Sequence, residues 1–291
     1  MLNKSIKILS PAKINWFLNV ENSKTGGYHQ LQTFMQKISL YDIIYIESID
    51  ENIINFYDYN NKCHCPVEKN IIVRAAHKLK NIFNVGSGVF ISIEKNIPVC
   101  AGLGGGSSNA ATVLNGLVKI WEIKISDIEL NEIAASLGAD VPFFLKTTAG
   151  ICEGIGERIK SVTPGNYNIV LWNPNNKLST AEVYKEFDKK EREQKNIRSF
   201  LDTYSLDDLS KKPNVIWNNL ALAAEELYPE LIQMRQSCME IGAVASWVSG
   251  SGPTVVSLCD NVVSAKKLAD ELRRKHPGDF ICECKTIIGN R

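Results

Sequence analysis

A glycine-rich segment at residues 98–111 is the part of the sequence that points most directly to chemistry. It has four glycines in the five positions 102–106, and two serines, Ser107 and Ser108, follow them. Glycine removes side chains where a backbone must approach a ligand closely, and the serines and alanines after it predict the start of a helix. The first N–H groups of a helix are unpaired and lie at the positive end of its dipole. The segment therefore predicts a phosphate-binding loop.

Two common phosphate-binding patterns do not fit this segment. No Gly-Lys-Ser/Thr follows the glycines, and position 107 is serine where a dinucleotide-binding G-x-G-x-x-G would need its third glycine. A flexible turn is the plain alternative. It is disfavoured because the loop continues directly into a helix with paired serines in its first turn.

A lysine and an acid in apolar surroundings are the next candidates for chemistry. Lys13 and Asn15 are two residues apart on a predicted strand and therefore share a face; a snorkelling lysine is the alternative. Asp140 lies in the apolar run 137–144, where an unpaired carboxylate would be costly, so it predicts a partner, a raised pKa, or both. A helix N-cap ahead of Pro142 is the alternative for Asp140.

A loop of small residues at 248–254 could let backbone approach a ligand. It contains Gly250 and Ser251 between two predicted strands. A tight connection between strands would look the same.

Length, charge and composition limit the classes of protein to consider. The 291 residues fit one large domain or two ordinary ones, and 44% hydrophobic with 22% charged residues is typical of globular proteins. A formal net charge of +1 disfavours a nucleic-acid binder. No apolar run approaches the ~20 residues that span a bilayer, and the first residues do not resemble a signal or transit peptide. We expect a cytoplasmic protein that binds neither nucleic acid nor membrane.

The eight cysteines fit a reduced compartment better than a disulfide framework. Two pairs, Cys63-His64-Cys65 and Cys282-Glu283-Cys284, are spaced more closely than zinc ligands usually are. We expect free thiols, the first pair on a polar loop and the second on one face of a strand.

The elements that must position these residues follow from hydrophobic periodicity and turn chemistry. The predicted strands are 6–9, 14–20, 31–39, 43–49, 53–57, 89–93, 151–162, 167–172, 244–248, 254–258 and 280–285. The predicted helices are 71–83 with Asn70 as N-cap, 107–121, one capped by Ser126 or Asp127 and ending near 138, 216–227, 229–241 and 262–274. The charged stretch 185–195 predicts an exposed helix or loop. The last elements favour a small α+β sandwich.

The four candidate segments, in this order, resemble the GHMP small-molecule kinases. The family's phosphate-loop motif corresponds to Pro98–Ala111, with an extra Gly-Gly and an Asn inside it. Pro11–Leu18, Gly26–Thr33 and Leu137–Phe143 match one branch of the family more closely, and the matches extend from residue 11 to beyond 250. The resemblance implies an α+β fold of two domains. Residues 1–160 would form an α/β domain like the second domain of a ribosomal protein, and 161–291 a ferredoxin-like α+β sandwich, with the active site in the cleft between them.

That branch transfers the γ-phosphoryl group of ATP to the 2-hydroxyl of a methylerythritol linked to cytidine diphosphate, in the non-mevalonate route to isoprenoid precursors. By resemblance, Asp140 is the catalytic acid and Lys13 the catalytic lysine that keeps it ionised. Mg²⁺ would bridge the ATP phosphates, near Ser107 or Ser108, with no acidic ligand evident. The ATP-binding residues implied by the resemblance are Pro98, Val99, Cys100, Ala101, Gly102, Leu103, Gly104, Gly105, Gly106, Ser107, Ser108, Lys95 and Asn70.

The substrate-binding residues so implied are Asn15, Tyr28, His29, Thr180, Tyr184, Gly250 and Ser251, with Tyr28 and His29 on the cytosine ring. We expect a monomer or a weak homodimer. Three alternatives stay open: another kinase of the family, of the mevalonate or homoserine type; a sensor on this fold that binds ATP and a metabolite without catalysis; and a nucleic-acid-binding module, which likeness of fold alone does not support.

Overall fold

The computed structural model describes residues 4–206 and 209–289. These residues divide into two compact units, each built from several stretches of chain. The first unit holds 4–12, 40–99 and 104–147, and the second holds 13–39, 100–103 and 148–289. The chain thus changes unit several times, and the single boundary expected at residue 160 stays a prediction.

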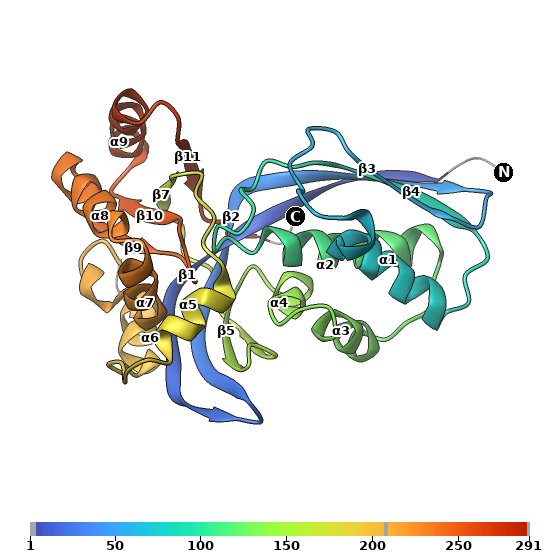
Figure 1. Ribbon diagram of the computed structural model, residues 1–291, viewed down its shortest axis with the longest axis horizontal. Coiled ribbons are helices and arrows are strands. Elements are labelled where there is room, and N and C mark those ends of the chain that lie inside the picture. Colours follow the sequence, from blue (N-terminus) through green and yellow to red (C-terminus); the bar gives the residue numbers. More distant parts are fainter. Residues whose placement is uncertain (1–3, 207–208, 290–291) are drawn as a thin grey trace. The chain divides into compact units, whose positions relative to one another are not determined.

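In the first unit, one sheet is covered by helices. Its strands β3 (Ile54–Asp58), β4 (Gly88–Glu94), β2 (Tyr28–Ile49) and β1 (Ser5–Thr25) are neighbours in that order. The helices are α1 (Ile71–Ile82), α2 (Gly105–Ile120), α3 (Asp127–Ala135) and α4 (Val141–Lys146), after a 3-10 turn at Val67–Lys69. Figure 1 shows α1 and α2 on one side of β3 and β4, with α3 and α4 further from these strands on that same side. Gly116 lets α2 approach the sheet closely, because a Cβ there would overlap Ile46 and crowd Ile8.

The helix caps in this unit are largely those that the sequence predicts. The Asn70 side chain accepts a hydrogen bond from the Ile72 amide at the start of α1, and Ser126 forms a capping box with Glu129 at the start of α3. The helix α2 begins at Gly105, two residues earlier than expected. Gly104 makes this start through its left-handed φ of 67°.

The second unit contains two groups of strands. In the first, β8 (Trp217–Asn218), β1, β2, β5 (Ala149–Gly154) and β6 (Arg158–Ser161) are neighbours. The second is a four-stranded sheet in the order β11 (Phe280–Lys285), β7 (Asn168–Asn173), β10 (Val255–Cys259) and β9 (Ala245–Val248). Its strands pair antiparallel. The remaining elements are α5 (Thr180–Phe187), α6 (Ile197–Leu206), a 3-10 turn at Pro213–Val215, α7 (Asn219–Leu227), α8 (Glu230–Ile241) and α9 (Val262–Lys275).

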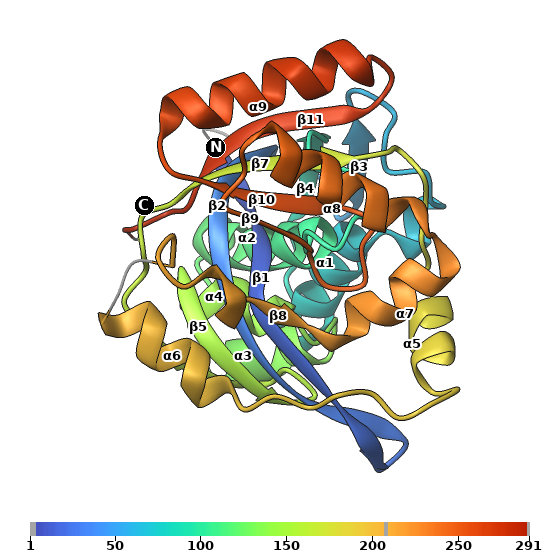
Figure 2. The same ribbon diagram turned by 90° about the vertical axis from the view of Figure 1, so that its left-hand side faces the viewer.

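One apolar core joins the helices of this unit to the four-stranded sheet. Leu231 of α8 and Leu268 of α9 pack in one buried cluster with Val170 and Val255 of the sheet. Figure 2 shows α9 running beside β11. This arrangement of helices on an antiparallel sheet agrees with the α+β sandwich that the sequence favours for the end of the chain.

The strands differ from the expected ones in two places. β1 and β2 are each continuous, where the sequence predicts two shorter strands in each. Pro11 does not interrupt β1, because β1 is the outermost strand of the sheet in the first unit and needs no second ladder there. The single strand expected over 151–162 is instead the hairpin of β5 and β6, which turns at Gly154 and Gly156 with φ of 75° and 113°.

The expectation for the charged stretch 185–195 is partly wrong. Most of it is exposed, but Arg192 is buried and makes two 2.7 Å hydrogen bonds to the carboxylate of Glu226 on α7. The helix α6, which the sequence analysis does not predict, follows this stretch. It buries Phe200, whose ring contacts Phe34 of β2.

All eight cysteines lie among the described residues, and no disulfide joins any two of them. Cys282 and Cys284 share a face of β11, as expected. Within the part of the chain that the structure describes, no group of three or more His, Cys, Asp and Glu side chains could hold a metal ion. None of the described helices is both long enough and apolar enough to cross a membrane.

Candidate active site

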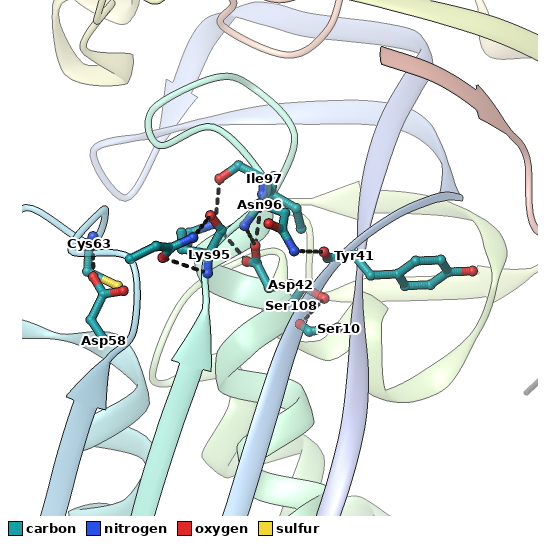
Figure 3. A network of polar contacts seen from close by, with 10 residues as sticks. Ser10, Tyr41, Asp42, Asp58, Cys63, Lys95, Asn96, Ile97 and Ser108 are labelled. Atoms are coloured by element: carbon teal, nitrogen blue, oxygen red, sulfur yellow. Dashed lines mark hydrogen bonds and ion pairs between the residues drawn. The ribbon is translucent and has the colours of Figure 1, made fainter. Parts of the chain in front are cut away.

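A buried ion pair supports the glycine-rich loop in the first unit (Figure 3). Asp42 of β2 is fully buried, and its Oδ2 lies 2.6 Å from Nζ of Lys95. Its Oδ1 accepts hydrogen bonds from the backbone amides of Asn96 and Ile97, at 2.7 and 2.8 Å. The Lys95 ammonium also donates to the Ile97 carbonyl. Two strands therefore hold the segment that leads into Pro98.

These contacts occupy Lys95, which was expected to contact ATP. Its backbone exchanges hydrogen bonds with Asn60, and its ammonium group is buried between Asp42 and Ile97. A Cβ on Gly105 would lie 3.1 Å from Lys95 Nζ, so the ammonium group lies directly under the first turn of α2. The geometry gives Lys95 a supporting role, and its contact with ATP stays a prediction.

The start of α2 has the form of an anion site. Gly105, Gly106 and Ser107 occupy its first positions, so their N–H groups precede the first hydrogen bond of the helix, which Ser108 donates to Gly104. The Ser108 hydroxyl is fully buried and hydrogen-bonded to Ser10 at 2.8 Å. Ser107 as a residue is partly exposed. Of the two serines, Ser107 is therefore the one placed to meet a ligand.

Asp140 and Asn70 both stand at helix starts in the first unit. Asp140 is the N-cap residue of α4, but its side chain makes no capping hydrogen bond there. The N-cap alternative for Asp140 is therefore right about its position at the start of α4, but its side chain does not form the capping hydrogen bond. The Asp140 loop runs close to α2, because a Cβ on Gly138 would lie 3.8 Å from Ser107 Oγ. Asn70 caps α1 with its side chain.

In the second unit, Lys13 lies in a buried polar group. Its Nζ donates to Asn15 Oδ1 at 2.6 Å and to the Gly102 carbonyl at 3.0 Å. The Asn15 amide donates in turn to Thr33 Oγ1 at 2.8 Å. Lys13 and Asn15 share a face of β1, as the strand period predicts, and both are buried. A snorkelling lysine would be exposed at its end, so that alternative does not describe Lys13.

The small-residue loop after β9 packs against the tip of the glycine-rich loop. Ser249 donates its hydroxyl to the Gly102 carbonyl at 3.1 Å. Gly102 has a φ of 74°, and a Cβ there would overlap the Ser249 carbonyl. A Cβ on Gly250 would lie 3.3 Å from the Gly102 carbonyl oxygen and 3.5 Å from Asn15 Oδ1. Only glycine fits at position 102, both for its backbone conformation and for this close approach.

The other residues expected to bind the substrate lie in the same unit, among them Tyr28 and His29, which were expected on the cytosine ring. Thr180 Oγ1 and Ser251 Oγ are hydrogen-bonded at 2.9 Å. One turn later on α5, the Tyr184 ring stacks on the His29 ring, with the two ring centroids 5.8 Å apart. Tyr28 is 66% exposed. The structure thus joins Thr180 to Ser251 and Tyr184 to His29, pairs that are far apart in sequence.

The His29 ring is held by acceptors on both sides. Its Nδ1 lies 2.6 Å from the Glu21 carbonyl oxygen, and its Nε2 lies 2.7 Å from Asp188 Oδ1. Asp188 Oδ2 is 2.5 Å from Lys24 Nζ. Burial works to raise the pKa of Asp188, but the hydrogen bonds from Lys24 and His29 outweigh it, and the pKa is lowered. Because a carbonyl and a carboxylate only accept, each of the two ring nitrogens of His29 faces a hydrogen-bond acceptor.

The other loop residues differ in exposure. Ala101 and Leu103 are buried, and the Leu103 carbonyl accepts from the Lys13 amide at 2.9 Å. Pro98 and Val99 are half-buried. Cys100 is exposed and has a φ of 55°.

Sequence reasoning missed three residues that organise these groups. Asp42 sits in a strand with no local signal, and its partner is 53 residues away. Asp188 lies in a charged stretch that predicts only solvation. Thr33 belongs to a segment that carried the resemblance, so it could have been found there.

The residue types found in each unit are those that phosphoryl transfer uses. Backbone N–H groups at a helix start and a lysine ammonium can neutralise phosphate charge. A carboxylate can orient a hydroxyl group or accept its proton. The aromatic group around His29 can hold a planar base by stacking.

Comparison with known proteins identifies the family. Residues 70–147 match the N-terminal domain of the GHMP kinases, and residues 197–278 match the C-terminal domain of the same kinases. A 4-diphosphocytidyl-2-C-methyl-D-erythritol kinase of Clostridioides difficile (strain 630) is 38% identical over 280 residues, which cover 95% of this chain and 94% of that protein. The kinase of the same name from Caldicellulosiruptor bescii is 37% identical and covers 92% of this chain and 94% of its own.

Solved structures agree. A crystal structure of 4-(cytidine 5'-diphospho)-2C-methyl-D-erythritol kinase superposes with a TM-score of 0.82 at 29% identity, over 98% of this chain and all of that one. A homoserine kinase from Cytophaga hutchinsonii, with a TM-score of 0.74 at 14% identity over 99% of this chain and 96% of its own, shares the fold. The expected two-domain α+β fold and the use of ATP as phosphoryl donor are therefore confirmed. The chain belongs to the GHMP kinase family, in its group of 4-diphosphocytidyl-2-C-methyl-D-erythritol kinases.

Proposed function

We propose that this protein transfers the γ-phosphoryl group of ATP to the 2-hydroxyl of 4-diphosphocytidyl-2-C-methyl-D-erythritol, giving ADP and the 2-phosphate. The observation that carries the proposal is the likeness to kinases of that name along nearly the full length of both chains. The aromatic and polar group around His29 supports a substrate with a planar base.

The first unit supplies the proposed phosphate loop and acid. The N–H groups of Gly105, Gly106 and Ser107 would bind ATP phosphates, with Asp42 and Lys95 holding the loop from beneath. Asp140 would accept or orient the proton of the attacked hydroxyl.

In the second unit, Lys13 supplies the proposed positive charge. Asn15 and the Gly102 carbonyl fix the ammonium group by two hydrogen bonds, so its position is set before a ligand arrives. An ammonium group held in this way stabilises negative charge on transferring phosphate without reorganising during the step.

Mg²⁺ fits the first turn of α2 through Ser107. Ser107 is a partly exposed residue whose Oγ lies near Gly138 of the Asp140 loop, whereas the Ser108 hydroxyl is buried against Ser10. Mg²⁺ usually keeps several waters and binds phosphate oxygens with one or two protein groups, so a single hydroxyl ligand suits it. When bound, the ion would neutralise phosphate charge.

For the cytosine ring, we propose stacking by Tyr28 and Tyr184. Tyr28 has an exposed ring, and Tyr184 is held against His29. Because both His29 nitrogens already have acceptors, His29 would order this group through its ring and meet the base through its backbone. Thr180 and Ser251 would contact the polar part of the substrate.

The test is ADP release with ATP, Mg²⁺ and 4-diphosphocytidyl-2-C-methyl-D-erythritol, with phosphorus NMR to place the new phosphate. We expect Asp140→Asn to lower kcat by about 10²- to 10⁴-fold. Lys13→Met should lower it by about 10²-fold or more. The matched control is Asp127→Asn, an exposed acid in the first turn of α3.

The alternatives predict other outcomes. Turnover of homoserine or mevalonate in place of the cytidine compound would favour another kinase of the family. ATP binding with no turnover of any of these alcohols would favour a sensor. Full activity of Asp140→Asn on the cytidine compound would keep the substrate and remove Asp140 from the chemistry.

A further inference from the structure

The second unit contains a pair of thiols that the proposed reaction does not use. Cys282 and Cys284 lie two residues apart on β11, so both side chains leave the same face of the strand. Their sulfur atoms are 3.5 Å apart. β11 is an outer strand of its sheet and pairs only with β7 among the described strands. Cys282 is partly exposed and Cys284 is buried, so a reagent would meet the first sulfur from solvent and find the second beside it.

The Cys284 thiol, the Arg273 guanidinium and the Glu283 carboxylate all act on the Cys282 thiol, and Glu283 opposes the other two by raising its pKa. The hydrogen bond from the Cys284 thiol lowers the pKa of Cys282, burial opposes this, and the Arg273 guanidinium on α9 lowers it further. The hydrogen bond to Cys282 and burial raise the pKa of Cys284 well above its ordinary value. The thiolate is the form of cysteine that binds thiophilic atoms.

The distance between the sulfurs suits a bridge by one atom better than a disulfide. A disulfide would require the sulfurs to approach to about 2.05 Å. A strand places Cα atoms two residues apart about 6.6 Å from each other, near the upper end of the range that disulfides span. An atom bonded to both sulfurs at about 2.3 Å with a tetrahedral angle would hold them about 3.8 Å apart. The observed 3.5 Å needs only a small adjustment to meet that value.

We propose that Cys282 and Cys284 form a two-sulfur chelating site for a single thiophilic atom, either trivalent arsenic or a soft d¹⁰ cation. With an organoarsenic oxide, two As–S bonds form while two S–H bonds and the As=O bond break. The oxygen leaves with both protons as one water molecule, and no oxidant or reductant is needed. With a divalent cation, two S–metal bonds form and two protons are released.

The other closely spaced pair, Cys63 and Cys65, is the natural comparison. Burial and the neighbouring Asp58 raise the pKa of Cys63 to about 12. A thiolate at Cys63 is therefore costly near neutral pH. The proposal therefore rests on the geometry of Cys282 and Cys284, whose sulfur atoms lie 3.5 Å apart on one face of β11, and not on the spacing in sequence that the two pairs share.

The first arm of the test treats the full-length protein with one equivalent of phenylarsine oxide. Intact mass should increase by one phenylarsenic group less two hydrogens. The adduct should resist an excess of a monothiol and be removed by dithiothreitol, because only two protein sulfurs on one arsenic give that stability. Peptide mapping of the wild-type adduct should place it on residues 282–284.

Variants locate the site. Cys282→Ser, at the partly exposed position, should abolish the monothiol-resistant adduct, whereas Cys63→Ser and Cys65→Ser should leave it unchanged. In the second arm, Cd²⁺ alone is titrated and the ultraviolet thiolate-to-metal absorption is followed; saturation at one ion that Cys282→Ser abolishes assigns the site to soft cations as well. An adduct that a monothiol strips, that maps to residues 63–65, or that survives Cys282→Ser overturns the proposal, as does failure of both probes to bind.

Discussion

The buried ion pair between Asp42 and Lys95 allows a stability prediction with a definite size. Asp42→Asn keeps an oxygen that can accept from the Asn96 and Ile97 amides, so those two hydrogen bonds survive. It removes the negative charge 2.6 Å from the Lys95 ammonium, whose side chain is 6% exposed. A buried pair that loses one partner typically costs about 3–5 kcal/mol, because the other charge stays buried without compensation. We expect Asp42→Asn to lower the free energy of unfolding by that amount.

A second variant separates the charge effect from packing. Asp42→Asn combined with Lys95→Met removes both charges, and such replacements are often close to neutral. The double variant also loses the hydrogen bond from Lys95 to the Ile97 carbonyl, which contributes roughly 1 kcal/mol. It should therefore be more stable than Asp42→Asn alone. Asp50→Asn, an exposed acid just after β2, is the matched control and should change stability by less than about 0.5 kcal/mol.

Urea unfolding followed by far-ultraviolet circular dichroism measures these free energies, and hydrogen exchange of residues 95–97 shows whether the loss is local. We expect faster exchange at the Asn96 and Ile97 amides in Asp42→Asn, together with a raised KM for ATP. A cost below about 1 kcal/mol for Asp42→Asn would refute the reasoning. Lys95→Met alone completes the cycle. If its cost and that of Asp42→Asn add up to the cost of the double variant within about 0.5 kcal/mol, the two charges do not interact and the reasoning is refuted.

Three further predictions concern the second unit. Gly102→Ala should greatly reduce turnover, because Gly102 has a left-handed φ and a Cβ there would overlap the Ser249 carbonyl. Gly278→Ala, with open space around it, is the control. Equal steady-state rates for Gly102→Ala and the wild type would contradict the prediction. Asp188→Ala should raise KM for the cytidine substrate several-fold with little change in kcat, because it removes the oxygen that holds the His29 ring. Glu182→Ala, at an exposed position of α5, should not change KM, and a loss confined to kcat would count against the positioning role. The hydrogen bond from Arg192 lowers the pKa of Glu226 to about 2. The pKa of Glu226 in the folded protein is thus below its value of about 4.3 in the unfolded chain. The ion pair therefore contributes its full stabilisation above about pH 4.3 and loses it as the pH falls toward 2. Unfolding at several pH values should therefore show wild type more stable than Glu226→Gln at pH 7 and equal to it near pH 2, and a difference that persists at pH 2 would exclude this ion pair as the cause.

Local features of the sequence were enough to predict most helices and the glycine-rich loop that leads into α2. Asn70 and Ser126 cap helices with their own side chains, and such contacts depend on neighbours only two or three residues away. The common face of Cys282 and Cys284 follows from the strand period alone. The family resemblance rested on motifs of the same local kind, and the relatives along nearly the whole chain confirm it.

Pairing within the sheet decides that β1 and β2 are continuous and that β5 and β6 form a hairpin. From the sequence, Pro11 predicts an interruption of the strand. It is tolerated because β1 is the outermost strand there, so that no neighbouring strand requires the N–H that proline lacks. The helix α6 has few local signals and is held by aromatic packing against β2. At Pro11 and in α6, the intrinsic preference of the residues for strand or helix is weak evidence, and tertiary contacts outweigh it.

The site shows the same division between local and tertiary information. The residue types and spacing around the glycine-rich loop predict what chemistry is available, because N–H groups at a helix start are a local property. The supports of that chemistry depend on residues far apart in sequence: Asp42 with Lys95, Asp188 with His29, and Ser249 with Gly102. A carboxylate or a hydroxyl has no preferred partner until the fold buries it beside one, and burial then makes the unpaired state costly. Only the tertiary structure could therefore decide which polar residues hold the site in place.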